Sequence, residues 1–180
     1  MAKLKISRPT PGEYAPGHAT YVAAVPDGDV LSMLKKQNGE MTRLLGRIGE
    51  KKSRHRYAPG KWSIREVIGH LIDAERVFTY RALTFARADR TPLPGFDENM
   101  WASASNGDSR TLKSLLDELK SVRAATLALF NGFTEEQMMR TGIASGHQVS
   151  VRGLLYVTTG HERHHAKILR DRYLARKTRA

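Results

Sequence analysis

Histidines cluster near the C-terminal end of the chain, where three of the seven lie within residues 161–165. The segment 160–165 reads GHERHH, and in a helix His161 and His165 stand one turn apart on the same face, where two imidazoles can bind one cation. His-Glu-x-x-His is also the signature of zinc proteases, in which the glutamate is the general base. The spacing indicates a metal site with Glu162 as the candidate catalytic residue. Because neighbouring helical positions diverge by about 100°, Glu162 either faces the metal or points away from it.

The third ligand has to come from upstream, because Asp171 is the one acidic side chain after His165 and no histidine follows it. The best candidate is His70, which lies in the apolar stretch 67–72. Three neutral imidazoles with an open fourth position are typical of catalytic metal sites. Two alternatives stay open: His70 as a hydrogen-bonded core histidine, and a surface cluster at 161–165.

Other polar residues are candidates for supporting roles. Glu66 lies one turn before His70 and Asp73 nearly one turn after it, so either can orient the imidazole, although Glu66 is also suited to a capping box with Ser63. His164 is expected to lie beside the ligands. The remaining histidines lie in loop-like segments and are not assigned to the site: His18, His55 and His147.

Long helices are needed to position these residues. Apolar residues spaced by three and four predict helices at about 29–49, 63–88, 109–131 and 150–174. A short capped helix is expected after Thr134, and no segment shows sustained strand alternation. Gly69 and Gly160, each beside a candidate ligand, allow two helices to approach closely. The fold is therefore predicted to be all-α, a four-helix bundle with long crossover connections.

The segments between the predicted helices show fewer sequence patterns that indicate structure. Residues 51–60 predict a basic turn, and 89–108 predict a loop long enough to be functional. In that loop, Phe96, Asp97 and Trp101 are candidates for a pocket lid. The alternative is that the two aromatic residues pin the loop to the bundle. We predict three parts of the chain: an extended N-terminal arm at 1–28, the four-helix domain at 29–175 and a basic tail at 176–180.

Composition excludes several function classes. The 180 residues include no cysteine, which excludes disulfides, thiolate metal sites and cysteine nucleophiles. No apolar run approaches the roughly 18 residues of a membrane span, and the N-terminus does not resemble a signal peptide, so we expect a cytoplasmic protein. The net charge of +12 is concentrated in residues 35–65 and 161–180. These stretches are either solvated helix ends or a surface for an anionic partner, and we expect no specific nucleic-acid binding.

Three segments carry a family resemblance. Residues 61–71, KWSIREVIGHL, resemble the W-S-x-x-E-x-x-x-H-L opening of the second helix in the DinB/YfiT-like family of metal-dependent enzymes. Residues 160–165 resemble the H-x-x-x-H motif of its last helix, and 91–97, TPLPGFD, look like a loop of a common subgroup. The resemblance covers about residues 28–175.

The resemblance implies a four-helix bundle of unusual connectivity that is commonly dimeric. It also implies a site that holds one divalent ion, usually zinc or nickel, on three histidines, which by position are His70, His161 and His165. Activities of the family include hydrolysis and the transfer of low-molecular-weight thiols, such as bacillithiol, mycothiol or glutathione-like cofactors, to electrophiles.

We therefore expect a metal-dependent enzyme, a homodimer, that acts on a small molecule. Thiol S-transfer is placed narrowly ahead of hydrolysis, because the basic stretches suit a carboxylate-bearing thiol. The alternatives are a metal-dependent hydrolase of the YfiT type and a non-catalytic, metal-stabilised binding module.

Overall fold

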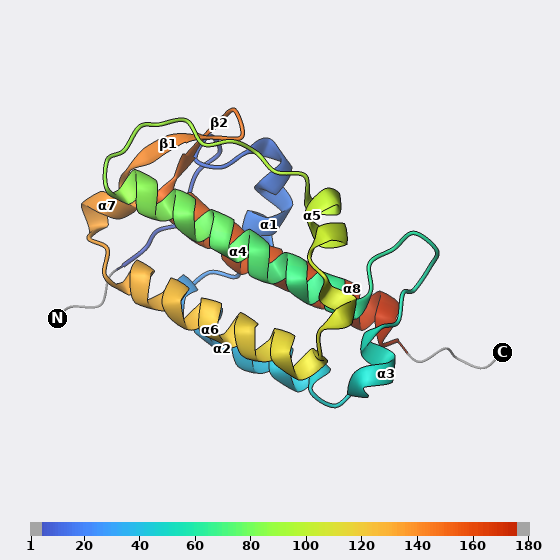
Figure 1. Cartoon of the computed structure of the whole chain (residues 1–180). Coiled ribbons are helices and arrows are strands. Elements are labelled where there is room, and N and C mark those ends of the chain that lie inside the picture. The colour runs from blue at the N-terminus through green and yellow to red at the C-terminus, as the bar shows by residue number, and fades with distance from the viewer. Residues whose placement is uncertain (1–4, 176–180) are drawn as a thin grey trace.

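The computed structural model describes residues 5–175. The bundle consists of four long helices, and Figure 1 shows the long helices packed side by side. Each contacts two of the others, so that the order around the bundle is α2, α6, α4 and α8. A π-helical turn, Leu169–Tyr173, extends the last helix. The four helices are α2 (Val30–Leu45), α4 (Ile64–Ala86), α6 (Leu112–Asn131) and α8 (Val151–Ile168).

Side-chain caps fix where the long helices begin. The predicted capping box is confirmed: the Ser63 hydroxyl accepts from the Glu66 amide, and the Glu66 carboxylate accepts from the Ser63 amide. The other three helices each begin after a residue whose side chain accepts a first-turn amide hydrogen, namely Asp29, Thr111 and Ser150. The predicted helices are therefore present, and α6 begins slightly later than expected.

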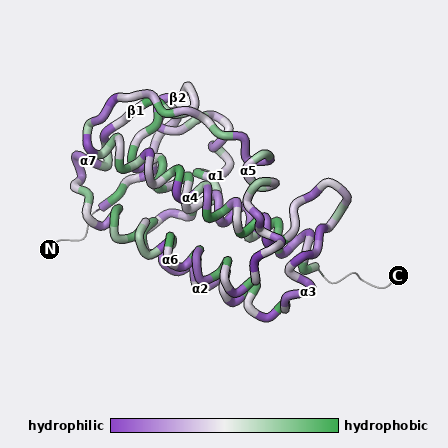
Figure 2. The backbone as a smooth tube through the Cα atoms, viewed as in Figure 1, coloured by the Kyte–Doolittle hydropathy of each residue, from purple (hydrophilic) through white to green (hydrophobic). Residues whose placement is uncertain are grey.

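The apolar core is divided into two clusters, one toward each end of the bundle. In Figure 2 hydrophobic residues concentrate along the long helices, whereas α3 (Gly49–Ser53) is mostly hydrophilic. One cluster includes Phe78, Phe85, Phe130 and Leu154. The other includes Met41, Ile68, Leu115 and Leu169. Between them lies a layer of buried polar residues, which contains Gln37, Glu75, Arg123, Thr159, Glu162 and three histidines.

A β-hairpin corrects the expectation that the chain has no strands. Strands β1 (Thr141–Ala144) and β2 (His147–Ser150) pair antiparallel, and the two turn residues between them, Ser145 and Gly146, have φ of 53° and 77°. Two such residues are typical of tight hairpins. Each strand has four residues, too few for a visible period of two.

The connections also hold more structure than expected. Within the predicted loop 89–108, Asp97 caps a helix, α5 (Glu98–Ala104), and Leu93 hydrogen-bonds to the hairpin. The predicted turn at 51–60 begins with the end of α3. Short helices of one or two turns bury too few apolar residues to leave a periodic pattern. Along the described residues, no helix is long and apolar enough to cross a membrane.

The N-terminal arm is not extended throughout, because it contains a helix, α1 (Ala19–Ala23), after a 3-10 turn at Pro16–His18. The arm lies against α8, where a Cβ on Gly160 would fall 1.9 Å from the carbonyl oxygen of Tyr21. The missing side chain at Gly160 therefore lets the N-terminal arm, and not α4, pack closely against α8. Gly69 faces Ser105, the residue that follows α5. The predicted basic tail, 176–180, lies outside the described residues.

Replacing Gly160 with alanine should destabilise the protein, because its methyl group would overlap the backbone of Tyr21 and push α1 away from α8. We expect the free energy of unfolding in urea to fall by about 2–3 kcal/mol. Gly39→Ala is the control: Gly39 is exposed in α2 with no atom within 4 Å of a new Cβ, and should gain about 0.5–1 kcal/mol. Equal changes in both variants would contradict the close contact.

Candidate metal centre

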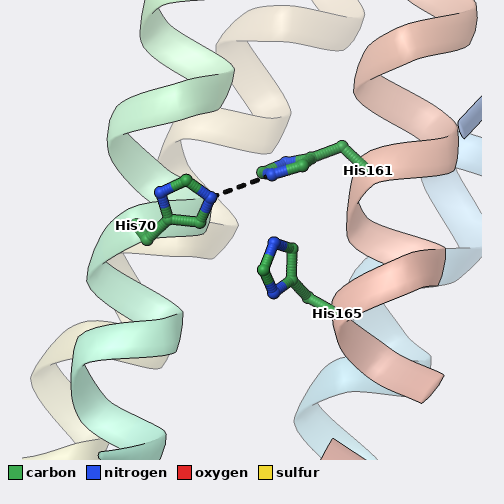
Figure 3. Close-up of side chains that lie close together, drawn as sticks. All are labelled: His70, His161 and His165. Atoms are coloured by element: carbon green, nitrogen blue, oxygen red, sulfur yellow. Dashed lines mark hydrogen bonds between the residues drawn. The ribbon is translucent and has the colours of Figure 1, made fainter. Parts of the chain in front are cut away.

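Three histidines from two helices meet inside the bundle. His70 comes from α4, and His161 and His165 come from α8, one turn apart as their spacing predicts. Figure 3 shows the three rings turned toward one another, with His70 Nε2 at 2.9 Å from His161 Nε2. One ring nitrogen of each residue lies within 4.8 Å of the other two. The structure thus brings together the three residues predicted as ligands.

Burial keeps these imidazoles neutral. Their exposed fractions are 7% for His70, 6% for His161 and 9% for His165. Loss of hydration lowers the pKa of His70 to about 4 and that of His165 to about 3. The pKa of His161 is also well below its usual value, first because of burial and then because of the neighbouring histidines. Near neutral pH all three therefore carry nitrogen lone pairs, as metal ligation requires.

The donor set fits a divalent metal ion. Imidazole nitrogens bind zinc and nickel well, and a three-histidine shell leaves one position for water or substrate. The sequence alternative of a surface cluster does not hold for His161 and His165, which are both buried.

Glu162, predicted as the catalytic residue, is not brought together with the trio. Its carboxylate pairs with Arg123 of α6, which also donates to both carboxylate oxygens of Glu75 at 2.7–2.8 Å. Burial raises the pKa of Glu162, and Arg123 opposes that rise. Although Glu162 follows His161 directly in α8, its side chain points away from the three histidines. This is one of the two orientations that the sequence allows for Glu162.

The carboxylates expected to orient His70 are engaged elsewhere. Glu66 closes the capping box and pairs with Arg56. Asp73 lies 3.9 Å from Arg76, and its side chain is 32% exposed. Among the described residues, no hydrogen bond joins either carboxylate to His70.

Aromatic rings, rather than carboxylates, surround the trio. The ring centroid of Trp62 lies 4.8 Å from that of His70, and the centroids of Tyr21 and Phe78 lie 5.3 and 5.7 Å from that of His161. Sequence reasoning did not assign these residues to the site, although Trp62 stands in the quoted 61–71 motif. His164 is exposed beside the trio, with its ring centroid 5.2 Å from that of His165.

A cavity of about 360 Å³ has the trio in its wall. Two histidines set aside in the sequence, His18 and His147, also line it, whereas His55 packs near Tyr173. Phe96 of the predicted lid reaches the cavity, and Trp101 packs on it with a centroid distance of 4.7 Å. Further polar lining comes from Arg81, Glu98 and Ser145.

The family follows from the match of residues 33–169, which include all three histidines, to the model of the DinB superfamily. The chain belongs to the DinB superfamily. A relative from Oceanobacillus iheyensis, named "Putative metal-dependent hydrolase", is 22% identical over 137 residues, 75% of this chain and 78% of the relative. One from Geobacillus thermodenitrificans, named in the same words, is 26% identical over 113 residues, 61% of this chain and 62% of the relative.

Solved structures confirm the predicted DinB/YfiT-like fold. YfiT from Bacillus subtilis, described as "a probable metal-dependent hydrolase with an unusual four-helix bundle topology", superposes with a TM-score of 0.70 at 17% identity. The match covers 81% of this chain and 91% of YfiT. A mycothiol-dependent maleylpyruvate isomerase superposes with a TM-score of 0.66 at 13% identity, over 81% of this chain and 61% of the isomerase.

The trio should bind one divalent ion per chain. His70→Ala or His165→Ala should remove stoichiometric metal, with a loss of affinity of more than about 100-fold, because two imidazoles cannot replace the three-nitrogen shell. The measurement is elemental analysis of protein purified without an affinity tag. His55→Ala, which changes a histidine away from the cavity, should keep its metal. A full equivalent of metal in His70→Ala would exclude this set of ligands.

Acid should destabilise the metal-free protein through the same residues. The pKa of His70 falls from 6.5 to about 4 on folding, and that of His165 to about 3, so the unfolded chain takes up protons that the folded protein does not. Their contribution to the free energy of unfolding is therefore complete above about pH 6.5 and declines as the pH falls toward about 3. Urea titrations between pH 4 and pH 7 should show a shallower decline in the double variant His70→Gln/His165→Gln. Equal slopes would contradict the burial of neutral imidazoles.

Proposed function

We propose that the protein is a metal-dependent hydrolase of the YfiT type that acts on a small molecule. The observation that carries the proposal is the convergence of three buried, neutral imidazoles on one wall of a cavity. The curated relatives support the reaction type, because both are named as metal-dependent hydrolases. They support hydrolysis more than thiol transfer, the reaction that the basic stretches of the sequence favour.

His70, His161 and His165 would hold one divalent ion, with zinc or nickel preferred over manganese because imidazole is a softer ligand than carboxylate. When bound, such an ion supplies Lewis acidity and a hydrolytic nucleophile at neutral pH. The chain itself supplies the surroundings. Trp62, Tyr21 and Phe78 pack around the imidazoles and exclude water from the side of the trio that they cover.

Proton transfer in this cavity would involve residues other than Glu162. Glu98 is the acidic residue of the cavity wall, and it lies close enough to raise the pKa values of Tyr21 and His70 by its charge. An exposed carboxylate at this place can accept a proton from an attacking water. Burial, followed by the charge of Glu98, raises the pKa of Tyr21, so its hydroxyl stays protonated and able to donate a hydrogen bond.

Thiol S-transfer is the second candidate. The chain has no cysteine, so the thiol would come from a cosubstrate that enters the same cavity. The fold shared with a mycothiol-dependent isomerase is compatible with this chemistry. The homodimer, the absence of specific nucleic-acid binding and the cytoplasmic location stay predictions.

Metal-loaded protein should cleave activated esters or amides without any thiol. His161→Ala should lower kcat/KM by more than about 100-fold, because it removes a ligand, while His55→Ala should retain activity. Release of a chromogenic leaving group, followed in metal-loaded and chelator-treated protein with and without a thiol, is the measurement. A strict thiol requirement would favour the second candidate, and full activity in the chelated protein would exclude a metal from the reaction.

A further inference from the structure

One face of α4 carries a second functional group along the same cavity. His70, Ala74, Phe78 and Arg81 all line it, and their spacing of three and four residues places them in one row on the helix. Arg81 lies three turns after His70, roughly 16 Å along the helix axis. Two apolar residues of this row, Ala74 and Phe78, therefore lie between His70 of the trio and the guanidinium of Arg81.

Arg81 is buried, with an exposed fraction of 4%, and no acidic group of the described residues pairs with it. Its Nη2 donates to the carbonyl oxygen of Pro94 at 2.7 Å and to the hydroxyl of Ser145 at 3.0 Å. The other buried arginines of the described chain each pair with a glutamate. These pairs are Arg65 with Glu50, Arg123 with Glu75 and Arg152 with Glu13.

A buried cation without a counter-ion is costly, which makes an anion the natural ligand for it. Burial lowers the pKa of Arg81, yet a guanidinium keeps its charge at every physiological pH. The two neutral acceptors contact Nη2, which leaves the rest of the planar fork to be matched by a ligand. A carboxylate matches one guanidinium in both charge and shape.

The charges in the cavity are separated along its length. The charge of Arg81 acts on His18, whereas that of Glu98 acts on Tyr21 and His70. An acidic group of a substrate would therefore be attracted to the Arg81 end and repelled by Glu98 at the trio end. The apolar side chain of Phe78 lies between the two ends on α4.

We propose that Arg81 binds a carboxylate of the substrate, so that the protein acts on molecules that carry a carboxylate at some distance from the bond that reacts. The proposal rests on the proposed function for the reacting end of the cavity. Arg81 is thus a specificity-determining residue. The competing role is a structural clamp that ties α4 to the hairpin turn through Ser145 and to Pro94.

Calorimetric titration with two probes of similar shape tests the anion site directly. The probes are 3-phenylpropionate and its neutral amide, added to metal-loaded and to chelator-treated protein. Arg81→Gln should weaken binding of the carboxylate about tenfold relative to the amide in both forms. Arg81→Lys, which keeps a charge, should give an intermediate loss. Arg90→Gln removes an exposed arginine as the control and should behave as the wild type.

A clamp predicts a different pattern. Ser145→Ala removes one contact of Arg81 but keeps the guanidinium, so the preference for the carboxylate should persist. The proposal would be overturned if Arg81→Gln lost the same affinity for both probes, or if the wild type bound the carboxylate no more tightly than the amide. A preference of more than tenfold for 2-phenylethyl phosphate over the carboxylate would overturn the choice of anion. If Arg81→Gln does not fold, Arg81→Lys and Ser145→Ala decide the question.

Hydrolysis separates this proposal from the proposed function. Mono(4-nitrophenyl) sebacate carries its carboxylate at the far end of a chain of eight methylenes, and 4-nitrophenyl decanoate is its neutral counterpart. The ratio of their kcat/KM values should favour the sebacate in the wild type and fall about tenfold in Arg81→Gln. Hydrolysis with no Arg81-dependent preference would refute the carboxylate site alone. Arg81-dependent binding without hydrolysis of either ester would refute the hydrolase alone.

Discussion

The structure depends on one buried guanidinium that ties all four long helices together. Arg123 of α6 donates to Glu75 of α4 at 2.7–2.8 Å, to the carbonyl oxygen of Leu34 in α2 at 2.8 Å, and to Glu162 of α8. Breaking such a buried pair by removal of one partner costs about 3–5 kcal/mol, because the other charge is left unpaired. Its geometry therefore fixes how the helices are rotated about their axes. The two apolar clusters lie on either side of the buried polar layer that contains Arg123.

That constraint explains why the histidine trio lies on a neighbouring face of α8. With Glu162 held by Arg123, the helical period places His161 about 100° and His165 about 60° around α8 from Glu162, on the same side of it, where both face His70 of α4. The arm seals the trio from one side because Gly160 lets the backbone of Tyr21 approach. Burial then lowers the histidine pKa values and leaves neutral ligands. The packing, the protonation state and the proposed chemistry thus follow from the same layer.

The sequence predicted the parts of the fold that rest on long helical periods and local caps. The Ser63–Glu66 capping box and the His161–His165 spacing are local, so they can be recognised without tertiary structure. The sequence does not show which way the Glu162 side chain points, because its direction depends on Arg123, which is 39 residues away in the chain. The hairpin and α5 are too short to show a period. His18 and Arg81 enter the cavity only when the arm and the hairpin fold over α4.

The central claim is that three imidazoles hold one ion in a shell with an open position. X-ray absorption spectroscopy at the edge of the bound metal tests this claim most directly in the purified protein. We expect three nitrogen donors at about 2.0–2.1 Å, with the multiple-scattering pattern of imidazole, and one further oxygen donor. A shell of oxygen donors alone, or one closed by a fourth protein ligand, would contradict it.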